Sequence, residues 1–143
     1  MTLKELQQEI ITNMKRWQKV EDNSIASTGQ IMQETDNPII RLVAEIIQRD
    51  SQMHHAIQGW IADSLEYKAP SLSPDELAKV GHLIEHHLAI ENKMIENAEE
   101  MLTTVKGKAM LAQQYFLAYL LEDESKHSHL LTSLQTLAKG MQP

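Results

Sequence analysis

The sequence predicts an all-α fold, a four-helix bundle formed by one domain of residues 1–143. Apolar residues recur at spacings of three and four along four long segments, as they do on one face of an amphipathic helix. The four prolines and five glycines stand mostly where helix ends are expected. No segment shows the two-residue alternation of a strand. Helices are expected at about residues 3–33, 38–67, 74–104 and 108–139.

The first two helices have recognisable start signals. Thr2 and Glu5 form a capping-box pattern ahead of the first apolar row, which consists of Leu3, Leu6, Ile10, Met14 and Trp17. Asn37 followed by Pro38 is typical of an N-cap with proline at the first helical position. The segment KAPSLS at residues 68–73 then predicts a loop after the second helix.

The last two helices follow this loop directly. Ser73, Pro74 and Glu76 again combine a capping box with an early proline, and Gly107 interrupts the apolar pattern before the final helix. Six loop residues span at most about 20 Å, whereas a helix of roughly 30 residues is about 45 Å long. The second and third helices are therefore expected to be antiparallel neighbours in an up-down-up-down bundle. Exchange of hairpins between two subunits is the alternative, and it predicts a homodimer.

Composition excludes several classes of function. The chain has no cysteine, so disulfide scaffolds, thiolate metal sites and thiol catalysis are excluded. The formal net charge of -7 opposes binding to nucleic acid and to anionic membranes. The first residues lack an apolar stretch of signal-peptide or membrane length, so we expect a cytoplasmic protein.

Acids and histidines interrupt the apolar row of every predicted helix. Along the chain these residues are Glu21, Asp50, His54, His87, Glu91, Glu124 and His127, with Asp123 beside the last row. Glu21 lies sixteen residues before Asn37, and Glu91 lies sixteen before Gly107. His54 and Glu124 each lie seventeen residues after the same two turns. These equal distances place the polar residues in one layer at mid-height of the bundle.

Several buried carboxylates in one layer require neutralising cations, because one isolated buried ion already costs several kcal/mol. No lysine or arginine lies on the core rows. Divalent metal is the simplest neutraliser, and a set of carboxylates and imidazoles suits iron, manganese or zinc. A hydrogen-bonded core histidine would explain any one of these histidines alone, and an outward tilt would explain any one glutamate, but neither explains their shared height.

These residues resemble the ferritin-like superfamily of di-iron carboxylate bundles, including rubrerythrin-type and bacterioferritin-type proteins. In that pattern one Glu comes from each of two helices and a Glu-x-x-His from each of the other two. Glu21 and Glu91 look like the single glutamates, and Glu124 with His127 matches one Glu-x-x-His. The second helix departs from the pattern, because Asp50 and His54 are four residues apart. The same spacing relates Asp123 to His127, which leaves either Asp123 or Glu124 as the ligand, and His87 is an additional imidazole.

The resemblance implies two bound metal ions, iron first and manganese or zinc as alternatives, that react with oxygen, peroxide or another small oxidant. The short second loop argues against a ferritin cage. A hemerythrin-like carrier or sensor is the alternative function, since His87-x-x-x-Glu91 fits part of its ligand pattern. A metal-free interaction module is a third possibility, and it leaves the inward carboxylates unexplained.

Overall fold

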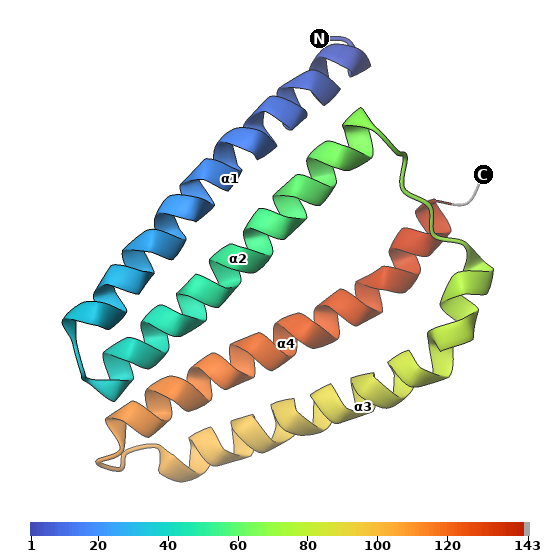
Figure 1. The fold of residues 1–143 in the computed structure, drawn as a ribbon. Coiled ribbons are helices and arrows are strands. Elements are labelled where there is room, and N and C mark those ends of the chain that lie inside the picture. The colour runs from blue at the N-terminus through green and yellow to red at the C-terminus, as the bar shows by residue number, and fades with distance from the viewer. Residues whose placement is uncertain (142–143) are drawn as a thin grey trace. The chain divides into compact units, whose positions relative to one another are not determined.

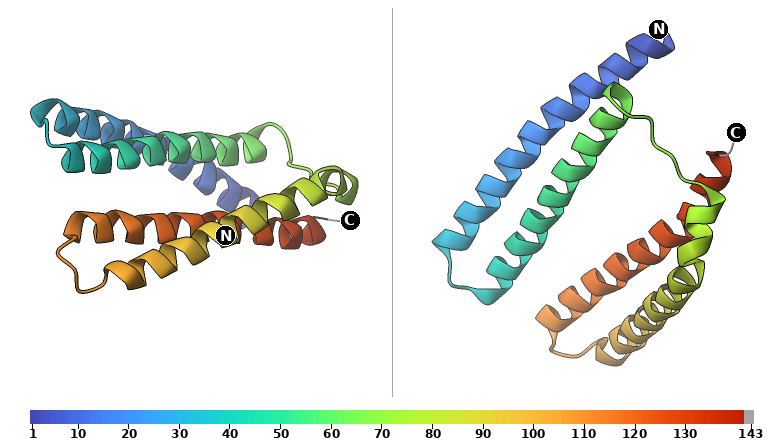
Figure 2. Two further views of the ribbon diagram at one scale, coloured as in Figure 1. Left: turned by 90° about the horizontal axis from the view of Figure 1, so that it is seen from below. Right: turned by 45° about the vertical axis from the view of Figure 1, so that its right-hand side comes forward.

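The computed structural model describes residues 1–141 and contains four α-helices. They are α1 (Leu3–Glu34), α2 (Pro38–Glu66), α3 (Pro74–Val105) and α4 (Leu111–Gly140). The chain divides into two compact units, a first hairpin (Met1–Pro70) of α1 and α2 and a second hairpin (Ser71–Pro143) of α3 and α4 (Figure 1). The same pairing of helices is visible from two further directions (Figure 2). An all-α fold with four helices is therefore confirmed. The prediction that they form a single domain stays a prediction.

The predicted start signals are present as hydrogen-bonded caps. The Glu5 amide donates to Thr2 Oγ1 at 3.1 Å, and the Thr2 amide donates to Glu5 Oε2 at 2.8 Å. Ser73 and Glu76 make the same reciprocal pair. The Asn37 side chain accepts two amide hydrogens of the first turn of α2. Each cap satisfies N–H groups that a helix start otherwise leaves without a partner.

The fourth helix begins later than the sequence predicts, at Leu111 rather than at residue 108. Gly107 has a φ of 76°, a left-handed conformation that glycine adopts without strain. The Lys108 amide then donates to the Val105 carbonyl at 3.0 Å, so the chain turns through residues 106–110 before helix resumes. The other helix ends lie within one residue of the predicted ones.

The first hairpin packs through smaller residues than its apolar rows predict. Ile11, Met14 and Ala62 form its buried cluster. The buried residues of α2 are Ala44, Ser51 and Ala62, whose short side chains allow α1 to approach closely. Trp17, which the sequence places on the core row of α1, keeps 47% of its surface exposed. The packed face of α2 is thus shifted by one residue from the predicted row, which leaves Asp50 and His54 at its exposed edge.

None of the helices in residues 1–141 has the length and apolar composition that crossing a membrane requires.

Candidate metal centre

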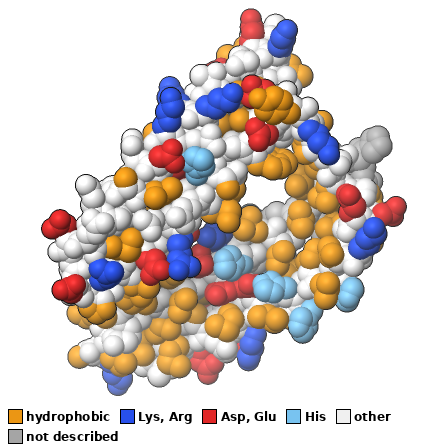
Figure 3. Space-filling view, in the orientation of Figure 1, with side chains coloured by type: hydrophobic (Ala, Val, Ile, Leu, Met, Phe, Trp, Pro, Cys, Tyr) orange, Lys and Arg blue, Asp and Glu red, His pale blue; other side chains and the backbone are white. Residues whose placement is uncertain are grey.

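The second hairpin brings three potential metal ligands together. Glu91 of α3 meets Glu124 and His127 of α4, and one ligand atom from each lies within 4.8 Å of the others. Glu124 and His127 share a face because they are three residues apart on one helix. Within the described part of the chain this is the one group of three or more acids and histidines at such distances. Figure 3 shows acidic and histidine side chains beside one another over this hairpin, with hydrophobic side chains around them.

Glu91 is the buried member of the group, with 7% of its side chain exposed. Its Oε1 lies 2.8 Å from Nε2 of His87 and 3.4 Å from Nδ1 of His127. Its Oε2 is buried and accepts no hydrogen bond from the described residues while Glu124 is ionised. A buried polar atom without a partner costs roughly 1–3 kcal/mol. A cation held between the two glutamates would remove this penalty, so the donor set fits a metal ion.

The two glutamates perturb one another. Hydrogen bonding with Glu124 is the largest effect that lowers the pKa of Glu91, and the neighbouring imidazoles of His87 and His127 lower it further, against the opposing effect of burial. The pKa of Glu124 is raised, first by hydrogen bonding with Glu91, then by burial and by the charge of Glu91. Without metal the pair therefore tends to hold one proton between its two carboxyl groups.

Asp123 lies outside the three-residue group and contacts the far side of His127. Its Oδ2 is 3.4 Å from His127 Nε2, and its Oδ1 is 2.8 Å from Nζ of Lys126. His127 Nδ1 faces the carboxylates, at 3.4 Å from Glu91 and 3.6 Å from Glu124. Metal-binding histidines commonly place their second ring nitrogen against a carboxylate in this way, which fixes the ring. Of the two acids that the sequence left open, the geometry places Glu124 with the group and Asp123 behind the histidine.

Neither a family model, nor a curated protein, nor a solved structure matches this chain. The donor geometry of the second hairpin therefore carries the functional assignment.

The first hairpin holds a smaller polar contact at the predicted position. Glu21 Oε2 lies 3.3 Å from His54 Nδ1, and this oxygen is buried without a hydrogen bond. The side chain of Asp50 is exposed, and no third ligand joins Glu21 and His54 within the described residues. Asp22 and His55 form a second pair across the same hairpin at 3.4 Å. The sequence rows did not select that pair, because both residues lie beside the apolar stripe.

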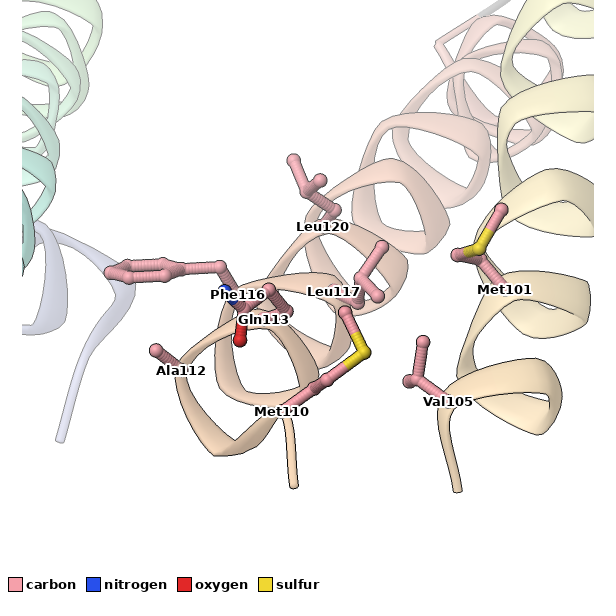
Figure 4. A pocket seen from close by; sticks show the side chains of 8 residues that line it. All are labelled: Met101, Val105, Met110, Ala112, Gln113, Phe116, Leu117 and Leu120. Atoms are coloured by element: carbon pink, nitrogen blue, oxygen red, sulfur yellow. The ribbon is translucent and has the colours of Figure 1, made fainter. Parts of the chain in front are cut away.

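A shallow apolar cleft of about 430 Å³ lies between α3 and α4 near their connecting turn. Figure 4 shows Met110 and Leu117 of α4 pointing toward Met101 and Val105 of α3, while Phe116 points away. Leu120, at the end of the cleft, precedes Glu124 by one helical turn. Apolar side chains therefore line the hairpin on this side of the polar group.

Proposed function

We propose that this chain is a metal-binding protein whose second hairpin holds a divalent ion between Glu91, Glu124 and His127. One observation carries the proposal: two carboxylates and an imidazole converge around a buried carboxylate oxygen to which no N–H group donates. Two carboxylates balance the charge of one divalent ion. A bound ion would also displace any proton from the glutamate pair, because metal-ligating carboxylates must be deprotonated.

Iron is the leading candidate for this ion, with manganese or zinc as alternatives, because oxygen and imidazole nitrogen donors suit all three. The resemblance to ferritin-like carboxylate proteins supports iron, and with it a role in reactions of oxygen, peroxide or Fe(II). A redox metal would supply the electron-transfer chemistry. The chain's own residues would hold the ion and orient its ligands. Asp123 fixes the ring of His127, and His87 contacts one oxygen of Glu91.

Metal content and thermal stability test the proposal. The full-length protein, loaded with Fe(II) under nitrogen or with Mn(II) or Zn(II) in air and then desalted, should retain metal by elemental analysis. It should melt at a higher temperature than the chelator-treated protein, because a ligand that binds only the folded state stabilises it. Glu124→Ala should remove both effects, whereas Glu99→Ala, at an exposed position of α3, should keep them. Failure of the wild-type protein to retain any of the three metals would refute the proposal.

Oxidation kinetics then separate the two functional classes. An oxidase or ferroxidase should oxidise bound Fe(II) faster than the same concentration of free Fe(II), as followed by stopped-flow absorbance after mixing with oxygen or peroxide. The contact between His87 and Glu91 at 2.8 Å adds an imidazole beside the group and favours the alternative, a histidine-rich carrier or sensor. Reversible uptake of oxygen without net oxidation of iron would select that alternative.

A further inference from the structure

The second hairpin carries half of the ligand set that two metals use in a four-helix site. Such sites take a single Glu from each of two helices and a Glu-x-x-His from each of the other two. Here α3 supplies one single Glu, Glu91, and α4 supplies one Glu-x-x-His, Glu124 with His127. Within the described chain this hairpin alone assembles such a half set. A second copy of the same hairpin would supply the other half.

The polar group is surrounded by large apolar side chains that a two-helix hairpin leaves exposed. On α3, Leu83 and Ile90 lie four residues before and three residues after His87, and they are 56% and 46% exposed. On α4, Leu130 lies three residues after His127 and is 62% exposed. Met94 and Leu120, at 43% each, extend the same two rows. An exposed apolar surface around half-buried ligands is typical of a surface that another protein covers.

We infer that this surface is covered by a second copy of the chain, related by a two-fold axis, whose own Glu91, Glu124 and His127 complete a shared two-metal site. The inference rests on the proposed function and names its partner. A two-fold interface uses the same surface on both subunits, so one half set automatically meets another. The charges of the shared site also balance, because four carboxylates from two copies neutralise two divalent ions.

The same charge count makes association depend on metal. Without ions, two copies would bring four carboxyl groups into one apolar interface, and desolvating those that are ionised opposes the dimer. With ions present, the attraction between metal and carboxylate replaces that repulsion. Metal affinity should therefore increase with protein concentration, since binding and association are linked.

The test uses the full-length protein with Mn(II), which stays divalent in the assay. Sedimentation velocity and native mass spectrometry should show a shift from monomer toward dimer on adding Mn(II), with two ions in each dimer and reversal by chelator. Glu124→Ala should abolish the shift. Leu130→Glu should also abolish it and weaken Mn(II) binding more than tenfold at protein concentrations where the wild type is dimeric. Leu83→Glu serves as a second variant on the other helix.

The matched control is Ile57→Glu in α2, because Ile57 lies three residues after His54 as Leu130 lies three after His127, and it is 48% exposed. This variant should dimerise normally, and circular dichroism should show that all four variants keep their helix content. A monomer that binds Mn(II) with the same affinity at every protein concentration overturns the inference and leaves the proposed function standing. A dimer that Ile57→Glu breaks and Leu130→Glu leaves intact also overturns it. Absence of Mn(II), Fe(II) and Zn(II) binding removes the inference and the proposed function together.

Discussion

The two hairpins carry similar polar residues at corresponding positions, yet they differ in how many of them meet. Glu21 of the first hairpin corresponds to Glu91 of the second, and each contacts a histidine of the opposite helix, at 3.3 and 3.4 Å. An Asp-x-x-x-His step occurs in α2 from residue 50 to 54 and in α4 from residue 123 to 127. Within residues 1–141, a third ligand lies within reach only in the second hairpin.

The presence or absence of a third ligand depends on the residue that directly follows the aspartate of each Asp-x-x-x-His step. It is Glu124 in α4 and Ser51 in α2. Ser51 is 4% exposed and forms a hydrogen bond of 2.8 Å with Ser24 of α1, so its short polar group is satisfied inside the helix contact. Glu124 instead brings a second carboxyl group to Glu91 and perturbs the pKa of both. Serine at this position gives a packed helix pair, whereas glutamate gives a potential metal site.

The largest expected effect comes from removing the central glutamate of each hairpin in turn. Glu91→Ala should lower metal affinity by more than the roughly 10–100-fold that residues supporting a ligand cost, because it deletes the buried member of the three-residue group. Glu21→Ala should change affinity much less, since His54 is the one candidate ligand of its own hairpin that contacts it within the described residues. Isothermal titration with Mn(II) at one protein concentration compares the two variants. Equal losses would show that both hairpins contribute equally to binding.

A smaller effect is expected when the serine is replaced by the missing carboxylate. In a Glu124→Ala background, Ser51→Glu should lower the stability of the metal-free protein by about 1–3 kcal/mol, because it breaks the contact with Ser24 and buries an acid. Mn(II) should then raise the melting temperature again, with Glu21 and His54 as the other ligands. The control is Ser51→Gln in the same background, because glutamine is similar in size to glutamate but carries no charge. This variant should also be less stable than its parent, but its melting temperature should not respond to Mn(II). A melting temperature of the glutamate variant that is insensitive to Mn(II) would show that more than this carboxylate separates the hairpins.

The helices could be predicted from sequence because their ends depend on local interactions. Thr2, Asn37 and Ser73 cap their helices through hydrogen bonds to residues two or three positions away, so the pattern and the structure coincide. The start of α4 was wrong by three residues, because Met110 makes no side-chain cap and the left-handed turn at Gly107 extends to it. Without a capping residue, the sequence contains no sharp signal for that boundary.

The site was harder to predict because it depends on which helix face packs. Periodicity placed Glu91, Glu124 and His127 on core rows, and the structure brings these three together. Periodicity also placed Asp50 of α2 and Trp17 of α1 inward, and both side chains are exposed. In α2 the small residues Ala44 and Ser51 form the contact with α1, so the predicted row that contains Asp50 lies at the exposed edge of that contact. A row of large apolar residues indicates a helix face only to within about one residue, or 100°, whereas ligand convergence requires a more accurate angle.

The smallest effect is the pH dependence of the metal-free protein, which should differ between wild type and Glu124→Gln. The pKa of Glu124 is raised above the ordinary value of 4.5, so its stabilising contribution is complete below that pH and is lost as pH rises through the raised pKa. The pKa of Glu91 is lowered, so its contribution is present above 4.5 and is lost as pH falls through the lowered pKa. Melting temperature in chelator should therefore fall on both sides of a maximum near pH 4.5, as far as this pair is concerned.

Glutamine at position 124 cannot ionise but keeps an N–H that can donate to Glu91, so it should remove the decline above pH 4.5 and keep the one below it. Glu99→Gln, at an exposed position, should retain the decline in melting temperature on both sides of pH 4.5 and serves as the control for loss of one surface charge. The measurement is a series of thermal melts in chelator for the three proteins across this pH range. The first hairpin offers no comparable carboxyl pair, since Ser51 replaces the second acid, so the whole difference between wild type and Glu124→Gln should arise in the second hairpin. A decline above pH 4.5 that is as steep in Glu124→Gln as in the wild type would mean that groups other than the Glu91 and Glu124 pair set the alkaline limb.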